Sequence, residues 1–375
     1  MSTTTHRSKP IVILLTDLFN NGGIQAYNRH LCEALATGFP QEQFIVVSMY
    51  DQPRHPALFR GNIRLVACKP RKNKFTGKWM FAMRAWWVII CRRPRFLICG
   101  HVGFAGLARF FRALTGLRYS VITHGTDVWD VKDGVKYNGL KEAQHIIAVS
   151  NYTKMRMVAN GIAADKIALI FNTVDTSLFY PKAPGGGPAG CVAELHRKVL
   201  LTVGRIERSE KYKGHDCLLE AVRLLGGEYL FLVAGTGDDL QRLKEKTRAL
   251  GLEEQVRFLG YVSDVELVDY YNLCDVFLMP SKGEGFGIVF LEALACGKPV
   301  IGGNTDGSVE PLMNGRLGFL VDPDDPRAIA DTVRYALTHK EARTDPVFLR
   351  GEVEKQFGIG AYNQRVHEIF SGLLR

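Results

Sequence analysis

Short apolar runs alternate with longer segments of mixed polarity along most of the chain. Runs such as Ile11–Leu15 and Phe44–Ser48 end at polar residues, which predicts buried β-strands. The segments between such runs, for example residues 24–36, are predicted to be helical. Strand alternating with helix indicates parallel βαβ units and doubly wound sheets, the α/β class. Further strands are predicted at residues 63–67, 95–99, 119–123, 145–150, 166–171, 199–205, 229–234, 256–261, 275–280, 299–303 and 317–321.

The length of the chain predicts more than one domain, because 375 residues exceed what a single hydrophobic core usually supports. Residues 181–190 are rich in proline and glycine and form the clearest linker. We therefore expect a first Rossmann-like domain at residues 1–175, a linker at 176–198 and a second Rossmann-like domain at 199–360. A last amphipathic helix is expected within residues 361–375.

The composition is that of a globular enzyme, with 46% hydrophobic and 23% charged residues. The eight cysteines show no CxxC pair, which favours a reduced, cytoplasmic setting over a disulfide framework. The first apolar run is too short for a signal peptide, and no run reaches the length of a membrane span.

Charge is distributed unevenly between the two halves of the chain. Residues 1–175 carry a net charge of +14 and the remainder a net charge of −4. Between Asp51 and Asp127 there is no acidic residue. This gap indicates a negatively charged partner or surface.

The same stretch contains a predicted helix at residues 78–93 that carries three of the four tryptophans, preceded by a basic run at 69–74. Tryptophan beside lysine and arginine suits the headgroup region of a membrane. The alternative is an ordinary crossover helix that packs on the sheet. A nucleic-acid surface is a third interpretation, but no recognised nucleic-acid motif supports it. The expected membrane surface consists of Arg71, Lys72, Lys74, Lys78, Trp79, Trp86 and Trp87.

The main candidate for chemistry is a glycine-rich loop at residues 281–287, which joins the strand at 275–280 to a helix over Ile288–Ala295. Such a loop exposes backbone N–H groups at a helix N-terminus and is suited to a phosphate. Glu284 in the loop and Glu292 in the helix lie at most about 12 Å apart by helical rise. They could grip hydroxyl groups of two rings, while the alternative is that both are solvated or salt-bridged.

Three further groups lie where doubly wound sheets bind ligands, near the ends of predicted strands. The turn Gly22-Gly23 follows the first strand, and His124 and Asp127 follow the strand at 119–123. Arg205 ends a strand and Lys213 opens the next helix, so both could hold a diphosphate. For each group the alternative is local: a tight turn, a His–Asp pair that shapes a loop, or solvated loop charges.

The segment from Glu284 to Glu292 resembles the Glu-x7-Glu signature of the retaining glycosyltransferases of family 4, which have the GT-B fold. The resemblance implies two Rossmann-like domains that face each other across a cleft, with the last helix returning to the first domain. In that family the first glutamate contacts the transferred sugar and the second the nucleotide ribose. His124 is then the strongest candidate in the catalytic zone, with Asp127 beside it, and Lys211 competes with Lys213 for the diphosphate. The implied donor-binding set is Gly22, Gly23, Arg205, Lys213, Tyr261, Val262, Glu284, Phe286, Gly287, Ile288 and Glu292.

The resemblance implies transfer of a sugar from a nucleoside diphosphate sugar to a hydroxyl acceptor, with retention and without metal or cofactor. With the basic first half, it indicates a lipid-linked or membrane-associated acceptor in cell-surface polysaccharide or glycolipid synthesis. The protein would then be peripheral to the inner face of the cell membrane. A GT-B phosphorylase or epimerase and a non-catalytic sugar-nucleotide-binding subunit remain alternatives. The sugar, the base, the acceptor and the oligomeric state stay open.

Overall fold

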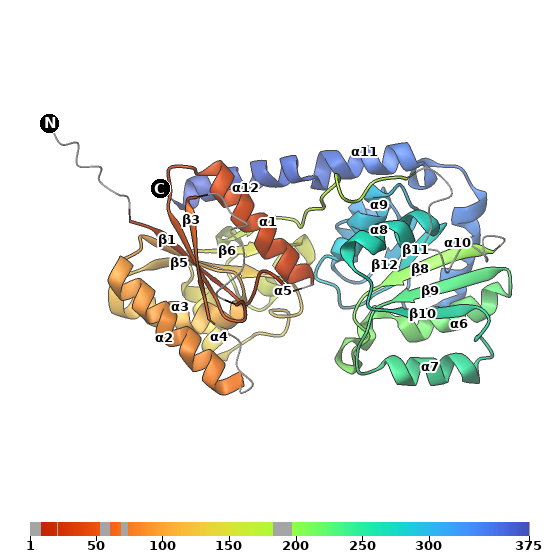
Figure 1. The fold of residues 1–375 in the computed structure, drawn as a ribbon, viewed down its shortest axis with the longest axis horizontal. Helices are drawn as coiled ribbons and strands as arrows, with labels where there is room; N and C mark the ends of the chain where they lie inside the picture. The colour runs from red at the N-terminus through yellow and green to blue at the C-terminus, as the bar shows by residue number, and fades with distance from the viewer. Residues whose placement is uncertain (1–8, 21, 53–60, 69–73, 183–196, 375) are drawn as a thin grey trace. The chain divides into compact units, whose positions relative to one another are not determined.

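The computed structural model describes residues 9–20, 22–52, 61–68, 74–182 and 197–374. The chain forms two compact units, which Figure 1 shows as a ribbon coloured along the chain. The first comprises Met1–Asn172 together with Tyr362–Arg375, and the second comprises Thr173–Ala361. Each unit contains one parallel sheet, so the predicted α/β class with two Rossmann-like sheets is confirmed.

The sheet of the first unit has seven parallel strands in the order β3-β2-β1-β4-β5-β6-β7. The strand order reverses between β1 and β4, and ligands bind outside the carboxyl ends of strands at such a switch point. The strands are β1 (Ile11–Leu15), β2 (Phe44–Ser48), β3 (Ile63–Ala67), β4 (Phe96–Cys99), β5 (Arg118–Thr123), β6 (His145–Ala148) and β7 (Ile167–Leu169). The helices are α1 (Gly23–Gly38), α2 (Lys74–Arg92), α3 (Ala105–Thr115), α4 (Gly134–Glu142), α5 (Asn151–Ala159) and α12 (Ile359–Leu373).

Helices α2 and α3 pack against each other on one face of this sheet (Figure 1). The Trp86 ring lies 6.0 Å from the rings of both Phe110 and Phe111, measured between centroids. Phe81 and Ala85 of α2 are buried in the same core as Val12, Leu14 and other residues of the strands. Helix α2 is thus a crossover helix with one face on the core.

The last helix of the chain, α12, packs against α1 within the first unit. The ring of Tyr362 meets the ring of Tyr27 edge-on at 6.1 Å, and His367 stacks on Phe39 at 5.0 Å. The carbonyl oxygen of Leu374 accepts a hydrogen bond from Arg95. The C-terminal segment is therefore part of the core of a unit whose other residues all lie before position 173.

The sheet of the second unit has six parallel strands in the order β10-β9-β8-β11-β12-β13, with its switch point between β8 and β11. Phe277 of this sheet contacts the rings of Tyr271 and Phe290, which belong to α8 and α9. The strands are β8 (Lys198–Val203), β9 (Tyr229–Ala234), β10 (Val256–Gly260), β11 (Val276–Met279), β12 (Val300–Gly303) and β13 (Phe319–Val321). The helices are α6 (His215–Leu225), α7 (Leu240–Ala249), α8 (Asp264–Leu273), α9 (Ile288–Ala295), α10 (Pro326–Thr338) and α11 (Pro346–Phe357).

The first residues of the second unit form hydrogen bonds with its helix α11. Arg350 of α11 donates hydrogen bonds to the carbonyl oxygens of Thr176 and Phe179. The hydroxyl of Thr173 donates to the carbonyl oxygen of Phe357 at 2.7 Å. Of the linker expected at 176–198, residues 183–196 lie outside the described residues.

After β12, the residues Gly307–Val309 form a short 3₁₀ turn. The carbonyl oxygen of Gly307 accepts from the backbone N–H of Glu310, three residues on. The next residue, Pro311, has no N–H with which to make the bond four residues on, so the turn does not continue as an α-helix.

Candidate active site

In the second unit, the glycine-rich loop between β11 and α9 is held by Asp306. This buried carboxylate accepts hydrogen bonds from the backbone N–H of Glu284 at 2.6 Å and from the Ser281 hydroxyl at 3.0 Å. The carbonyl oxygen of Glu284 accepts from the N–H of Gly307 at 2.9 Å. A β-carbon on Gly307 would lie 2.3 Å from the carbonyl oxygen of Gly285, so only glycine allows this approach. The backbone at Glu284 is therefore fixed on both sides.

The side chain of Glu284 forms an ion pair with Lys213, with 2.5 Å between Oε1 and Nζ. Lys213 also lies 3.8 Å from a carboxylate oxygen of Glu210, and Glu210 pairs with Arg205. The Lys213 and Glu284 side chains are 13% and 15% exposed, whereas that of Arg205 is 73% exposed. Lys211 is exposed, so Lys213 is the lysine of this cluster.

The electrostatics of the cluster keep Lys213 charged. Burial lowers the pKa of its amine, but the neighbouring charge of Glu284 and the hydrogen bond to it raise it, and the net pKa lies above the ordinary value. The position suits an anion, because both cations lie at the carboxyl end of β8 beside the switch point of the sheet.

Glu292 is partly buried in α9 and accepts a hydrogen bond from the Tyr271 hydroxyl at 2.8 Å. Burial raises the pKa of Glu292 to about 7, against the lowering effect of that hydrogen bond. Helix α9 begins at Ile288 because Gly287 adopts a φ of 86°, which favours glycine. A carboxylate in this apolar wall is stabilised by hydrogen-bond donors, which ligand hydroxyl groups would supply.

The other residues of this unit that are expected to bind the sugar nucleotide differ in how far their side chains are exposed. The Phe286 side chain is buried against Phe357, so only its backbone is available to a ligand. Tyr261 is exposed after β10, Val262 is partly buried beside it, and Ile288 is partly buried in the first turn of α9.

In the first unit, His124 lies between β5 and α4, and its ring nitrogen Nε2 is 2.8 Å from the carbonyl oxygen of Gly100. A carbonyl oxygen can only accept, so Nε2 carries the proton. Burial lowers the pKa of His124 to about 4, which leaves the ring neutral near pH 7. The ring of Tyr27 meets it edge-on at 5.2 Å. The ring is therefore fixed in orientation and tautomer.

Asp127 lies beside this histidine, and its Oδ1 accepts from the backbone N–H of His124 at 3.0 Å. Its Oδ2 is buried and has no hydrogen-bond partner among the described residues. The ring nitrogen Nε2 of His101 lies 3.8 Å from this oxygen. Burial raises the pKa of Asp127 to about 7. This oxygen is ready to accept a hydrogen bond from a hydroxyl group.

The glycine turn of the first unit lies between β1 and α1. Gly22 is exposed with a φ of 151°, and a β-carbon there would lie 2.4 Å from the Gln25 side chain. Asp17 accepts hydrogen bonds from the side chains of Asn20 and Gln25, which holds the turn in place. Gly22 and Gly23 therefore present backbone at the switch point of the sheet.

The residues expected to form a membrane surface on and before α2 differ in their exposure to solvent. Trp79 and Trp87 are 60% and 68% exposed, whereas Trp86 is partly buried against α3. Lys78 is exposed. Arg71, Lys72 and the side chain of Lys74 lie outside the described residues.

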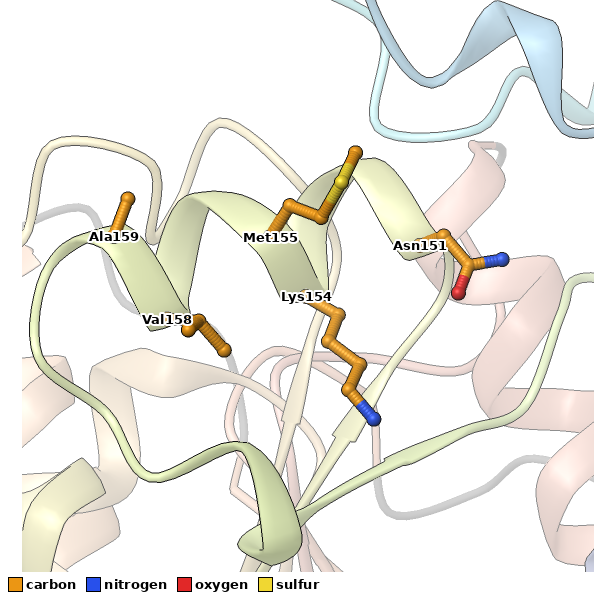
Figure 2. A pocket seen from close by; sticks show the side chains of 5 residues that line it. All are labelled: Asn151, Lys154, Met155, Val158 and Ala159. Carbon is orange, nitrogen blue, oxygen red and sulfur yellow. The ribbon is translucent and has the colours of Figure 1, made fainter.

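An open hollow of about 550 Å³ lies along α5, away from these residues. Asn151, Lys154, Met155, Val158 and Ala159 line it, and all five come from that helix (Figure 2). These five lining residues include no carboxylate and no histidine.

Within the described ranges, none of the helices combines the length and the apolar character needed to cross a bilayer. Over the same residues, no group of three or more histidine, cysteine, aspartate or glutamate side chains is arranged to hold a metal ion.

Sequence reasoning missed four residues that shape the two sites. His101 follows β4 as His124 follows β5, so the same rule on strand ends would have found it. Glu210 lies three residues before Lys213, a spacing that predicts contact only if the segment is helical. Tyr271 and Asp306 gave no local signal, because their partners lie 21 and 22 residues away along the chain.

Two family models match the chain. "Glycosyltransferase Family 4" covers residues 21–178, and "Glycosyl transferases group 1" covers residues 192–347. A GDP-mannose-dependent alpha-(1-6)-phosphatidylinositol monomannoside mannosyltransferase of Mycobacterium tuberculosis is 34% identical over 208 residues, 52% of this chain and 52% of that protein. D-inositol 3-phosphate glycosyltransferase of Corynebacterium urealyticum is 30% identical over 258 residues, 58% of this chain and 60% of that protein. The chain thus matches about half the length of these curated relatives.

Solved structures with the same fold match nearly the whole chain. Sucrose-phosphate synthase from Thermosynechococcus elongatus superposes with a TM-score of 0.81 at 21% identity, over 97% of this chain and 99% of that one. Anabaena HepE in complex with UDP and glucose gives a TM-score of 0.76 at 18% identity, over 96% and 99% of the two chains. The fold is that of the GT-B glycosyltransferases. Within this class, the chain is consistent with glycosyltransferase family 4, whose model matches residues 21–178.

Proposed function

We propose that this protein transfers a sugar from a nucleoside diphosphate sugar to a hydroxyl group of an acceptor, with retention of the anomeric configuration. The observation that carries the proposal is the cluster at the switch point of the second sheet. There the cations of Lys213 and Arg205 adjoin the glycine loop, and Glu292 lies in the helix that the loop opens. Cations, N–H groups and a carboxylate match the diphosphate and the ribose of a nucleotide sugar.

Each residue has a role in this proposal. Glu292 accepts hydrogen bonds from the ribose hydroxyls, and Glu284 accepts them from the transferred sugar. Lys213 and Arg205 neutralise the diphosphate. In the first unit, His124 and Asp127 form hydrogen bonds with the transferred sugar and the acceptor. The bond from the sugar to the leaving phosphate breaks as the bond to the acceptor oxygen forms on the same face. The acceptor proton passes to the leaving phosphate.

The test begins with a thermal-shift screen of nucleoside diphosphate sugars, because a ligand that binds the folded state raises the melting temperature. With the sugar nucleotide that stabilises most, free nucleoside diphosphate should appear only when an acceptor is added. A phosphorylase or an epimerase would not show this dependence. Stabilisation without any acceptor-dependent release, across a panel of acceptors, would instead favour a non-catalytic binding subunit.

The charge on the leaving diphosphate is neutralised by side chains in this proposal, so transfer does not need a divalent metal ion. Lys213→Ala and Arg205→Ala should each lower the rate about 100- to 1000-fold, as the loss of one transition-state contact typically does. The wild type should keep its rate in a chelator. Activity that chelator abolishes and magnesium or manganese restores would contradict this part of the proposal.

A lipid-linked acceptor at an anionic membrane is the finer form of the proposal. It is supported by the exposed apolar side chains of α2, which follow one another at helical spacing and are joined by two from α3. Exposed basic side chains accompany them, and the surrounding stretch of sequence has no acidic residue. The mannosyltransferase relative is named for a phosphatidylinositol mannoside acceptor. We call this surface the α2–α3 ridge: Trp79, Met83, Trp87, Ile90, Phe110 and Leu114.

This interpretation places the protein on the inner face of the cell membrane, where it would contribute to polysaccharide or glycolipid synthesis. Apolar side chains would enter the headgroup region while the basic side chains meet anionic lipid. The opposite face of α2 packs in the core, as expected for an ordinary crossover helix. A membrane surface on one face and a crossover helix on the other are therefore compatible.

A further inference from the structure

In the structure, the two cations of the proposed donor site are paired with carboxylates. Glu210 pairs with Arg205 through one carboxylate oxygen and lies 3.8 Å from Lys213 through the other. Glu284 pairs with Lys213 at 2.5 Å. Two positive and two negative charges therefore balance, so a diphosphate adds its negative charge to a site that has no net charge of its own.

The two carboxylates differ in how firmly they are held. Glu210 is in the 3₁₀ segment Arg208–Lys213, is 8% exposed and contacts both cations. One of its oxygens has no hydrogen-bond partner among the described residues. The Glu284 side chain pairs with Lys213, and it projects from the glycine-rich loop at residues 281–287.

The backbone around Lys213 cannot move aside to release it. The N–H of Lys282 donates to the carbonyl oxygen of Tyr212 at 2.9 Å. A β-carbon on Gly214 would lie 2.4 Å from the carbonyl oxygen of Pro280, and one on Gly283 would lie 2.5 Å from the Tyr212 ring. The two loops are thus in close contact, so a change at Lys213 must be a change of side-chain partner.

We propose that binding of the sugar nucleotide exchanges one ion-pair partner of Lys213. The diphosphate of the sugar nucleotide replaces the Glu284 carboxylate, which turns to the hydroxyl groups of the sugar. Glu210 remains paired with Arg205 and Lys213 throughout and acts as the positioning residue for both cations. This inference rests on the proposed function. It makes the bare nucleoside diphosphate a poor ligand, because that ligand breaks the ion pair and offers Glu284 no hydroxyl in return. After transfer, Glu284 returns to Lys213 and favours release of the nucleoside diphosphate.

The test compares the affinities of bare and sugar-bearing nucleotides by calorimetry, with UDP, GDP, UDP-glucose and GDP-mannose as probes. Glu284→Gln removes the competitor for Lys213, so it should bind the bare nucleotide about tenfold more tightly than wild type. The extra affinity that the sugar confers should shrink in the same variant. If bare nucleotide binds this variant no better than wild type, the exchange is overturned while the proposed function stands.

Asp324→Asn is the matched control. Asp324 also pairs with a lysine at 2.5 Å, but that lysine, Lys282, is exposed to solvent and lies outside the cluster. The control should leave every affinity unchanged. Tighter binding of bare nucleotide by the control as well would show a general charge effect and overturn the exchange. If no probe binds wild type, both the exchange and the proposed donor class fail.

The role of Glu210 as positioning residue is tested separately, by measuring the melting temperature without ligand. Glu210→Gln and Glu284→Gln each leave Lys213 with one carboxylate, whereas the double variant leaves a buried, uncompensated charge. The double variant should therefore lose more than the sum of the two single losses. Bound nucleotide should restore most of that difference. Additive losses would overturn the assignment of Glu210.

Discussion

At the scale of single residues, burial is the largest cause of the shifted pKa values of His124, Asp127 and Glu292. It lowers the pKa of His124 to about 4 and raises the pKa of Asp127 to about 7. His124 is therefore neutral near pH 7, and Asp127 is largely neutral only below pH 7; both states suit hydrogen bonding to hydroxyl groups. In the second unit, the same cause raises the pKa of Glu292 to about 7.

The raised pKa of Glu292 predicts a pH-dependent stability. Its folded pKa lies above the ordinary value of 4.5, so between these two values the folded state binds more protons than the unfolded state. The free energy of unfolding therefore falls as the pH rises through this window. In chemical denaturation at several pH values, Glu292→Gln should lose less stability than wild type between about pH 5 and pH 8.

Tyr271→Phe is the companion variant to this prediction. It removes the hydrogen bond that lowers the Glu292 pKa, so the loss of stability should extend to higher pH than in wild type. If Glu292→Gln and wild type show parallel stability curves, the pKa of Glu292 is the same in the folded and unfolded states and the argument from burial is wrong.

At the scale of elements, α2 combines two faces with different surroundings. One face is in the core through Phe81, Ala85 and Val88, while the other exposes Trp79 and Trp87. Monomeric proteins seldom expose large contiguous apolar patches, so a partner for this face is expected. The α2–α3 ridge extends the row onto a second helix, which a single-helix pattern does not predict.

The ridge predicts binding to anionic membranes. Wild type should co-sediment with vesicles that contain anionic lipid at low salt and be released at high salt, because basic side chains contribute about 1 kcal/mol each near the surface. Trp79→Ser with Trp87→Ser should weaken this binding at low salt while leaving donor affinity unchanged. Substituting Met155 and Val158, exposed apolar residues of α5, gives the matched control. A wild type that remains in the supernatant with anionic vesicles at low salt would contradict the membrane proposal.

At the scale of the whole molecule, the chain starts and ends in the same unit. Tyr362–Arg375 belongs to the unit built by the first 172 residues, while α11, just before it in sequence, belongs to the second. Phe370 of α12 and Leu349 of α11 are both fully buried. Two helices separated only by Gly358 therefore stabilise different hydrophobic cores.

This arrangement predicts that neighbouring variants destabilise different units. Phe370→Ala should cost about 3–5 kcal/mol and Leu349→Ala about 2–5 kcal/mol, as truncation in a core usually does. In hydrogen exchange, the first should lower protection in β1 and β4 and the second in β11 and α9. Loss of protection in the same strands for both variants would contradict the division into units.

Much of the fold was predictable from the sequence because the signals are local. Apolar runs bounded by glycine and polar residues located β1, β2, β8 and β11 to within a residue or two, and the helix expected at 288–295 has those bounds. The parallel orientation of the strands followed from the βαβ pattern, whereas the order of the strands within each sheet was not predicted.

The sequence by itself determined which chemical groups follow which strands: Glu284 and Lys213 in the second half of the chain, His124 and Asp127 in the first. Only the tertiary structure decided their partners. Glu284 pairs with Lys213 across 71 residues of sequence, and Tyr271 reaches Glu292 across 21. The same holds for the tryptophans, of which α3 covers Trp86 and leaves Trp79 exposed. Periodicity reports the face of one element, whereas a contact requires a second element whose position depends on the packing of the whole core.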